Sequence, residues 1–407
     1  MKTSDFDYHL PESSVAQTPA EPRDSSRLLV LHRDTGKIDH RIFRDVADYL
    51  RAGDLLVLNQ TRVIPARIFA HKETGGRVEI LLLRRRDTLT WEALVGGKGL
   101  RVGKRVFIKV SETSNSSSIP GTSASSETSD ASGSPAPSDS SVLSDSSVPS
   151  GSFGTSAASV ASTPSENPKA LPPLQAEILE ILEGSERLIR FSEPIEPHFS
   201  KVGNVPLPPY IHEKLGDPER YQTVYAKEPG SAAAPTAGLH FTPRLLEELQ
   251  VKGVRIAYVT LHVGLDTFAP VTEDDPEEHK IHTEWCELPQ EKADIINQTK
   301  KSGGRIVAVG TTSVRTLESA AIVNRQSEII NGQDTISSYL GPTSLYILPG
   351  FQFKVVDAMI TNFHLPKSTL LMLVSAFAER EKILETYNTA VEEGYRFYSF
   401  GDAMLIL

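Results

Sequence analysis

The segment RIVAVGTTSVRTLESAAIV, residues 305–323, contains the clearest signal of fold class in this chain. RIVAVG (305–310) has the length and β-branched content of a buried strand, and the segment from Ser313 to Val323 has the length and composition of a helix. A strand that turns directly into a helix is typical of α/β domains, in which helices cover a parallel or mixed sheet. The segment therefore predicts an α/β layer.

Similar segments lie on both sides of it. Further strands are predicted for DLLVLN (54–59), YQTVYA (221–226), VRIAYVTLHV (254–263) and FKVVDAMIT (353–361). A helix predicted for 243–253 has Pro at its first position and ends at Gly, and one long helix is predicted for 368–387. The predicted fold class is α/β, with a central mixed or parallel sheet and flanking helices.

A second region consists of strands alone. Four segments are rich in Val, Ile, Leu and aromatic residues, which either alternate with polar residues or follow one another, and glycine-containing turns lie between them. These segments are 77–85, 90–97, 104–110 and 186–194. They predict a small antiparallel β domain. Residues 174–183 fit either a short helix or a strand connection.

Residues 111–168 interrupt this β domain with Ser, Thr, Pro, Gly and Ala, no Lys or Arg, and a single aromatic residue, Phe153. Such a composition cannot bury enough apolar surface to offset backbone entropy, so we predict a disordered insertion. An inert loop is the simpler interpretation, because the entropy cost of a flexible loop grows slowly with its length. A regulatory phosphorylated segment is the alternative.

The net charge of −10, from 42 basic and 52 acidic residues, is unevenly distributed along the chain. Residues 111–168 hold six acids, whereas Gln60–Lys109 holds 12 basic and 4 acidic residues, a net charge of about +8. That charge over so short a region is typical of a surface that binds a nucleic-acid backbone. A well-solvated basic face is the alternative. The candidate binding residues are Arg84, Arg85, Arg86, Arg101, Lys104 and Arg105.

Other features exclude several classes of protein. The single cysteine, Cys286, excludes an intramolecular disulfide and a multi-cysteine metal site. The N-terminal residues lack a secretory signal, and no apolar run is long enough to span a bilayer, so we expect a cytoplasmic protein without membrane association. The chain also lacks a P-loop, a G-x-G-x-x-G turn after a strand, a G-x-S-x-G elbow and an H-E-x-x-H helix.

Polar loops follow the predicted strands, at the end of an α/β sheet where ligands bind. After 305–310 come hydroxyl residues and an arginine: Thr311, Thr312, Ser313 and Arg315. Backbone amides, hydroxyls and the positive helix end together predict an anion site for a carboxylate or a phosphate. The loop after 353–361 repeats this arrangement with His364 and Lys367 ahead of a Ser or Thr cap.

Histidines mark the same loops, at His240, His262 and His364. If these loops share one pocket, one of the imidazoles could act as a general base near neutral pH. The spacing His279-x-x-His282-x-Glu284 could suggest metal ligation, but it lacks a third obvious ligand, so no metal site is expected.

Long segments of the chain resemble the family of S-adenosylmethionine:tRNA ribosyltransferase-isomerases, which act in queuosine biosynthesis. The segments include DLLVLNQTRVIPARI (54–68), YQTVYAKEPGSAAAPTAGLHFT (221–242), VTLHVGLDTFAPV (259–271), AVGTTSVRTLES (308–319), TNFHLPKSTLLMLVSAFA (361–378) and YRFYSFGDAML (395–405). The resemblance implies an α/β main domain, 1–60 and 205–407, and an inserted β-barrel domain, 61–204, that contains 111–168.

The resemblance also implies a reaction. The ribosyl group of S-adenosylmethionine is transferred to 7-aminomethyl-7-deazaguanine at the wobble position of tRNA and isomerised, which forms epoxyqueuosine and releases adenine and methionine. S-adenosylmethionine is then a consumed co-substrate, and no bound cofactor is implied. The implied partners are this tRNA and S-adenosylmethionine, and we expect the chain to act as a monomer.

The loop residues suggest roles in such a reaction. The base that removes a proton next to the sulfonium is expected to be His262 or Asp266, and the acid His364 or His240. The methionine carboxylate or a tRNA phosphate is expected to bind Thr311, Thr312, Ser313 and Arg315, with Lys367 as a further substrate-binding residue. Stacking on adenine or the target base is expected from Phe241, Phe268 and Phe363.

Two other functions fit parts of this pattern. In a non-catalytic tRNA-binding protein, the loops would only shape an RNA surface, and S-adenosylmethionine would not bind. An α/β transferase of phosphoribosyl groups would need a carboxylate-rich loop for a metal-bound diphosphate, which the sequence lacks.

Overall fold

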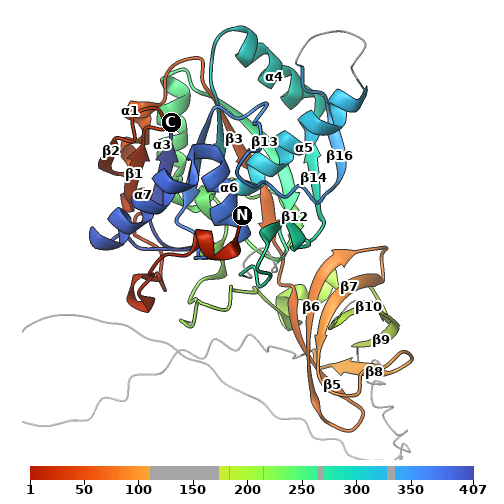
Figure 1. The fold of residues 1–407 in the computed structure, drawn as a ribbon. Coiled ribbons are helices and arrows are strands. Elements are labelled where there is room, and N and C mark those ends of the chain that lie inside the picture. The colour runs from red at the N-terminus through yellow and green to blue at the C-terminus, as the bar shows by residue number, and fades with distance from the viewer. Residues whose placement is uncertain (111–173, 183, 214, 265–269, 328–334) are drawn as a thin grey trace, which may run out of the picture. The chain divides into compact units, whose positions relative to one another are not determined.

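The computed structural model describes residues 1–110, 174–182, 184–213, 215–264, 270–327 and 335–407. It contains a mixed sheet flanked by helices and a closed antiparallel barrel (Figure 1), which confirms the predicted fold class. The disordered insertion predicted for 111–168 lies outside the described residues.

The main sheet has, within the described residues, nine strands in the order β16-β14-β13-β3-β15-β17-β18-β1-β2. Their bounds are β1 (Arg27–Leu31), β2 (Ile38–Ile42), β3 (Leu55–Asn59), β13 (Arg255–His262), β14 (Glu284–Leu288), β15 (Ile306–Val309), β16 (Tyr339–Thr343), β17 (Ala358–Asn362) and β18 (Ala403–Ile406). The neighbours β13, β3, β15 and β17 are parallel, β18 and β1 are parallel, and the other pairs are antiparallel.

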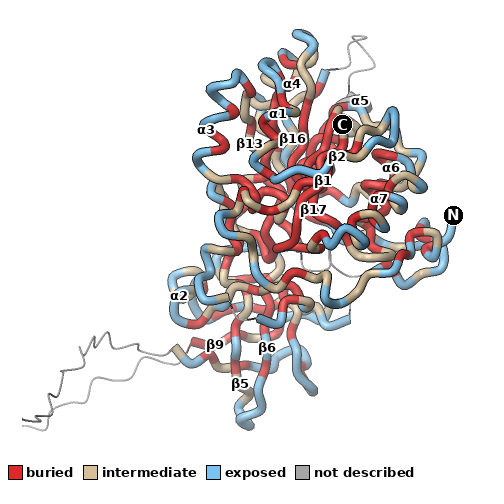
Figure 2. Tube along the Cα trace, turned by 90° about the vertical axis from the view of Figure 1, so that its left-hand side faces the viewer, coloured by how far each residue is buried: buried red, intermediate tan, exposed pale blue. Residues whose placement is uncertain are grey.

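The central strands are buried on both faces, as parallel strands covered by helices require. Along β3, Leu55 and Val57 belong to one core cluster, and Leu56 and Leu58 belong to another. One face is covered by α4 (Gln290–Lys301), α5 (Thr311–Ser327), α6 (Thr369–Ala378) and α7 (Arg380–Glu392), and the other by α1 (Val46–Tyr49) and α3 (Pro243–Val251). Figure 2 shows the buried residues concentrated along the strands.

The barrel is built from antiparallel pairs, and its bounds are β5 (Arg67–Lys72), β6 (Arg77–Arg85), β7 (Thr90–Gly96), β8 (Arg105–Ile108), β9 (Leu174–Ile181) and β10 (Glu186–Phe191). Pairing of β5 with both β6 and β8 closes it, which leaves only short edges. The segment that sequence left undecided, 174–183, therefore contains strand β9. Three shorter elements lie beside these sheets: α2 (Phe199–Val202), β11 (Gly203–Asn204), which pairs with β5, and the parallel ribbon of β4 (Thr61–Val63) with β12 (Glu228–Ser231).

Three element predictions were wrong, each because of a tertiary partner. The strand predicted from residue 353 begins at Ala358, because the amides of residues 354–356 donate to the buried Glu318 carboxylate instead of a strand. Residues 221–226 form no strand: a 3₁₀ turn ends at Tyr221, and the side chain of Gln222 pairs with the backbone of Val63.

The third concerns the long helix predicted for 368–387, which is two helices. The chain turns at Glu379, where φ is +66°. The first helix, α6, is buried almost throughout, whereas α7 exposes one side. The change of direction lets each helix bury the face that its sequence makes apolar.

Asp54 joins the starts of β3 and β15. Its fully buried carboxylate accepts hydrogen bonds from the backbone amides of Arg51 (3.0 Å) and Arg305 (3.1 Å) and from the Arg305 guanidinium (2.6 and 3.2 Å). Burial alone would raise the pKa of Asp54, but the hydrogen bonds from Arg305 and the backbone outweigh it and lower the pKa.

Asp54→Asn is therefore expected to lower the free energy of unfolding at pH 7 by about 2–4 kcal/mol, because Arg305 loses its buried partner. The deficit relative to the wild type should shrink below about pH 4, since the stabilisation by ionised Asp54 is lost as pH falls through its lowered pKa. Urea unfolding followed by circular dichroism at pH 7 and pH 3 measures both effects.

The control is Asp34→Asn, at an exposed carboxylate. It should change the unfolding free energy by no more than about 0.5 kcal/mol. Equal stability of Asp54→Asn and the wild type at pH 7 would contradict the structural role of Asp54.

Candidate active site

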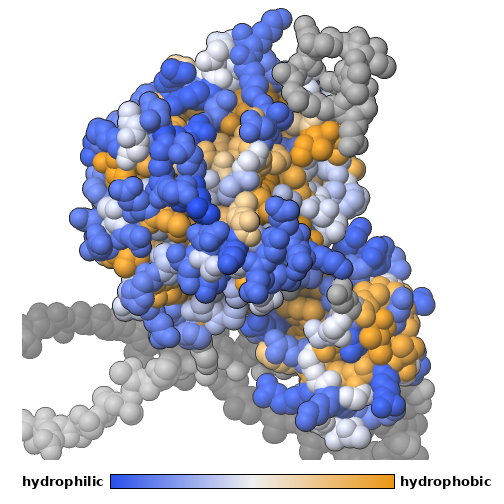
Figure 3. Space-filling view, in the orientation of Figure 1, coloured by the Kyte–Doolittle hydropathy of each residue, from blue (hydrophilic) through white to orange (hydrophobic). Residues whose placement is uncertain are grey.

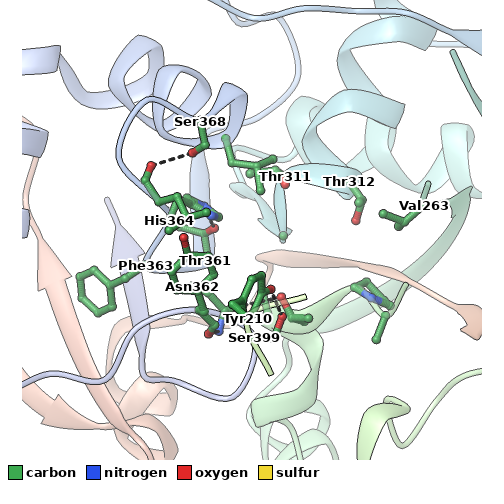
Figure 4. Close-up of a pocket in the computed structure, with 18 residues that line it drawn as sticks. Tyr210, Val263, Thr311, Thr312, Thr361, Asn362, Phe363, His364, Ser368 and Ser399 are labelled. Carbon is green, nitrogen blue, oxygen red and sulfur yellow. Dashed lines mark hydrogen bonds between the residues drawn. The ribbon is translucent and has the colours of Figure 1, made fainter. Parts of the chain in front are cut away.

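A cavity of about 620 Å³, partly open to solvent, lies where several strands of the main sheet end. Its walls come from the ends of β13, β15 and β17 and the loops after them, as expected for parallel strands. Further lining comes from the segment before α3 and from residues ahead of β18 (Figure 4). Among the described lining residues there is no Asp, Glu, Lys or Arg, so this part of the wall is neutral and carries hydroxyl, amide and imidazole groups.

The N-terminus of α5 forms one wall. Gly310, at φ +82°, turns the chain from β15 into the helix, and a left-handed φ favours glycine there. Thr311 and Thr312 line the cavity (Figure 4), and the buried Oγ1 of Thr312 has no hydrogen-bond partner among the described residues. Ser313, predicted to join them, instead donates its hydroxyl to the Val309 carbonyl at 2.8 Å. Two of the three predicted hydroxyl residues therefore line the cavity.

Arg315 points elsewhere. Its guanidinium forms a buried ion pair with Glu284 of β14 and donates to the Leu345 carbonyl at 3.1 Å. It lines a neighbouring cavity of about 460 Å³ together with His279 and His282. The structure thus separates Arg315 from the threonines with which sequence reasoning grouped it.

Of the predicted proton-transfer residues that the structure describes, His364 lines the cavity, whereas His240 and His262 do not. In His364, the Nε2 lies 2.8 Å from the Thr361 hydroxyl, the backbone amide donates to the Tyr387 hydroxyl at 3.1 Å, and the carbonyl accepts from Tyr8. Burial lowers the pKa of His364 to about 3. The ring is therefore neutral at pH 7, and without substrate it lacks the second ring proton that a general acid would donate.

His240 lies behind the cavity wall. Its Nδ1 is 2.7 Å from the Ser26 hydroxyl, its Nε2 is 3.1 Å from the Asn362 amide nitrogen, and its ring stacks on Phe43. Since an amide nitrogen can only donate, Nε2 is the acceptor and Nδ1 carries the proton. Burial, with the charges of Arg396 and Arg23, lowers the pKa of His240 to about 3. The ring therefore fixes the side chain of Asn362, which lines the cavity.

His262 does not line the cavity, although the next residue, Val263, does. Successive side chains of a strand point to opposite faces, and the His262 ring lies against Gly230, with Nδ1 2.8 Å from the Thr61 hydroxyl. Burial lowers the pKa of His262, although nearby Glu228 opposes the shift. The other candidate base, Asp266, lies outside the described residues.

The predicted stacking residues and Lys367 pack mainly against other parts of the protein. Phe363 is one of the cavity-lining residues, but its side chain is fully buried among Tyr387, Tyr395 and Phe397, and in Figure 4 its ring points away from the other labelled side chains. Phe241 is also fully buried and packs edge-on against Phe43. Lys367 pairs with Asp7 at 2.7 Å. Phe268 lies outside the described residues.

Sequence reasoning missed an aromatic part of the wall. Tyr210 and Tyr398 both line the cavity, with ring centroids 4.2 Å apart, and the Tyr210 hydroxyl is 2.7 Å from that of Ser399. Tyr398 and Ser399 lie in the segment YRFYSFGDAML, which carried the resemblance but no predicted role. Tyr210 follows a proline-rich stretch that no strand or helix pattern marks.

The basic residues predicted to bind tRNA lie on the barrel. Arg85, Arg86 and Arg105 form ion pairs with Glu196, Glu92 and Glu177, and Arg84 lies 5.5 Å over the Trp285 ring. Arg101 and Lys104 are exposed and make no ion pair with any described residue. Residues 174–204, which complete the barrel, hold six acids and three bases, so the net charge of 60–109 and 174–204 together is +5.

The barrel surface is not uniformly polar. Figure 3 shows hydrophobic residues gathered over part of it, and its exposed side chains include Phe69, Leu179 and Ile181. Apolar and basic groups therefore occur on the same barrel, as in surfaces that contact both bases and phosphates.

In the His279-x-x-His282-x-Glu284 motif, two of the side chains bind other protein groups. His279 lies 2.9 Å from the Glu273 carboxylate, and Glu284 pairs with Arg315. The described residues contain no cluster of three or more His, Cys, Asp or Glu side chains that could hold a metal ion. The described helices also include none with the length and apolar character that a membrane crossing needs.

Comparison with known proteins relates the whole chain to one family. The family model described as "Queuosine biosynthesis protein" matches residues 3–406. Proteins named S-adenosylmethionine:tRNA ribosyltransferase-isomerase from Acetivibrio thermocellus and Desulfitobacterium hafniense are 48% and 47% identical, over 100% of this chain and of each relative. A solved structure of S-adenosylmethionine tRNA ribosyltransferase from Thermotoga maritima is 36% identical and covers 99% of this chain and 100% of its own, with a TM-score of 0.48.

The two neutral histidines predict acid sensitivity. In the folded protein the pKa values of His240 and His364 are near 3, whereas in the unfolded chain they are near 6.5. Between these two pH values, the unfolded chain therefore binds protons that the folded protein does not. Stability should therefore fall as pH drops from 6.5 towards 3, by up to about 1.4 kcal/mol per pH unit for each histidine. Urea unfolding at pH 7.5, 6.5 and 5.5 measures this slope.

His364→Gln should remove about one histidine's share of the slope, whereas the control His9→Gln, at an exposed position, should keep the wild-type slope. A slope that is unchanged in His364→Gln would show that His364 titrates alike in the folded and unfolded chains.

Proposed function

The chain belongs to the family of queuosine biosynthesis proteins, and on that basis we propose which reaction it performs and which residues act. Like the relatives that match it over their whole length, it is a ribosyltransferase-isomerase with S-adenosylmethionine and tRNA as substrates. We propose that the ribosyl group is transferred to 7-aminomethyl-7-deazaguanine at the wobble position and isomerised to epoxyqueuosine, with release of adenine and methionine. The full-length match is the observation that carries this proposal.

The cavity has the chemistry that S-adenosylmethionine requires. Its described wall carries no charged side chain, and burial keeps His364 neutral, so nothing there repels the positive sulfonium. A cavity at the strand ends, lined by polar side chains, also argues against a protein whose loops only shape an RNA surface.

The N-terminus of α5 is the proposed site of the methionine carboxylate. A helix start offers unpaired backbone amides and a partial positive charge, and α5 is 17 residues long. Thr312 adds a buried hydroxyl without a partner among the described residues, and Thr311 lines the same wall. A carboxylate placed here would satisfy these donors. Ser313 and Arg315 are not part of this proposal, since both have internal partners.

Proton transfer is proposed for Asp266 and His364. The reaction begins with removal of a proton from the carbon next to the sulfonium, which the positive sulfur acidifies. A carboxylate or a neutral imidazole can accept that proton, and the hydrogen bond between the His364 ring and Thr361 involves Nε2 rather than Nδ1. A histidine that has accepted a proton can later return it to the departing adenine. His262 faces away from the cavity wall and is the weaker candidate.

Release of adenine tests the proposed function. Wild-type protein incubated with S-adenosylmethionine and tRNA bearing the deazaguanine precursor should release adenine and form epoxyqueuosine, both measurable by liquid chromatography. Asp266→Ala and His364→Ala should slow this turnover by about 10²–10⁴-fold, the usual contribution of general acid–base catalysis. His262→Ala should have a smaller effect.

Two outcomes would contradict the proposals separately. Wild-type protein that binds the tRNA but neither binds S-adenosylmethionine nor releases adenine would support the non-catalytic alternative. Near-normal turnover in both Asp266→Ala and His364→Ala would leave the reaction standing and overturn the assignment of proton transfer.

For tRNA binding we propose the basic side of the barrel. Arg101→Glu combined with Lys104→Glu should weaken tRNA binding and lower the slope of log affinity against log salt by about 0.7–0.9 for each phosphate that the protein no longer neutralises. Charge reversal of Arg84, Arg85 and Arg86 should have the same direction with a smaller effect per residue, because two of these already pair with carboxylates. Filter binding at several salt concentrations measures both.

The matched control is Lys301→Glu, an exposed lysine at the end of α4 that changes net charge without touching the barrel. It should leave the salt slope unchanged. Unchanged binding in both barrel variants would place the tRNA-binding surface elsewhere.

A further inference from the structure

Tyr398 lines the cavity and carries two energetic costs, a strained backbone and a buried hydroxyl without a partner among the described residues. Its backbone adopts φ +71°, a left-handed conformation that is rare for a bulky side chain. Its hydroxyl is buried, the residue being 5% exposed, and has no hydrogen-bond partner among the described residues. Strained backbone is concentrated at active sites and ligand sites, and a buried polar group without a protein partner can be satisfied by a bound ligand.

The strained conformation is held on both sides. The Tyr398 amide donates to the Phe363 carbonyl at 3.1 Å, and the Tyr398 carbonyl accepts from the Asn362 side chain at 3.2 Å and from the Gly401 amide at 2.9 Å. Asn362 ends β17, and Phe363 begins the loop after it, which also carries His364. The fold therefore fixes Tyr398 in the wall beside the residues proposed to act on the substrate.

The Tyr398 hydroxyl is free to donate a hydrogen bond to a ligand. Burial raises the pKa of Tyr398 above its usual range, so the phenol keeps its proton, and it lacks an acceptor. The Tyr398 ring packs against the ring of Tyr210. The Tyr210 hydroxyl forms a hydrogen bond with the Ser399 hydroxyl, and Figure 4 shows these two residues side by side in the cavity. An aromatic wall with one unused donor matches a planar heterocycle that has an acceptor nitrogen.

We propose that Tyr398 binds the adenine ring of S-adenosylmethionine and that its hydroxyl donates a hydrogen bond to a ring nitrogen. The inference rests on the proposed function. Adenine presents several acceptor nitrogens, whereas a 7-deazapurine lacks one of them, so the unused donor suits adenine better than the target base.

The same hydrogen bond assists departure of adenine. When the bond between the sugar and adenine breaks, its electron pair passes to the adenine ring and the ring nitrogens become more negative. A hydrogen bond to one of them then strengthens in the transition state, which favours bond breaking. Tyr398 supplies no proton in this step; it specifies the leaving group and stabilises its charge.

Tyr398→Phe tests the proposal, because it keeps the ring and removes only the hydroxyl. The dissociation constant of S-adenosylmethionine, measured by calorimetry without tRNA so that no turnover occurs, should rise about 3- to 10-fold. The melting temperature of the ligand-free variant should equal or exceed that of the wild type, because a buried hydroxyl without a partner is removed. A merely structural hydroxyl would not produce this combination.

Tyr225→Phe is the matched control. The Tyr225 hydroxyl is also buried without a hydrogen-bond partner among the described residues, and Tyr225 does not line the cavity. Its removal should leave the dissociation constant unchanged. In addition, an S-adenosylmethionine analogue that lacks the accepting ring nitrogen should bind Tyr398→Phe and the wild type equally.

Equal affinity of Tyr398→Phe and the wild type for S-adenosylmethionine would overturn the proposal. So would a loss of affinity for tRNA alone, which would place the target base against Tyr398. Both results are distinct from failure of the proposed function, in which wild-type protein itself releases no adenine from S-adenosylmethionine and tRNA.

Discussion

Burial of four parallel strands on both faces is the constraint on which the main sheet depends. Strands β13, β3, β15 and β17 can exclude water only if helices cover each face, and their alternating side chains fill two separate core clusters. Parallel strands also end at one edge, so the loops after β13, β15 and β17 must lie together. The cavity is the result: Val263, Thr312 and His364 reach it from segments far apart in the sequence.

The described part of the cavity wall is neutral and carries hydroxyl groups that have no hydrogen-bond partner in the described protein. Burial suppresses the charge of His364 and of the supporting His240, while the Asn362 side chain is held between His240 and the Tyr398 carbonyl. Neutral polar groups fixed in this way can surround a cation without repelling it. The hydroxyls of Thr312 and Tyr398 remain without partners in the described protein, so a bound ligand has hydrogen bonds to gain from both.

Much of the fold followed from local patterns. Short apolar runs predicted β3, β13 and β15, and proline and glycine marked the ends of α3. The site was predicted less completely, because a pattern shows which residues follow a strand but not where each side chain points. Thr311 and Thr312 line the cavity as expected, whereas Arg315, one helical turn later, forms an ion pair with Glu284 of β14. His262 and Val263 differ by one position, and only Val263 lines the cavity.

Composition and the spacing of apolar residues were enough to establish the α/β class, the β-rich region with its excess of bases, and the loops that follow the strands, because these features depend on local patterns. The partners of the polar side chains were decided by tertiary structure alone. Glu318 binds the amides of residues 354–356, so the predicted strand begins only at Ala358. Glu284 pairs with Arg315, which does not line the cavity, and the Phe363 carbonyl accepts from the amide of the strained Tyr398. Such interactions join residues tens of positions apart, so the pattern of residues around either partner cannot predict them.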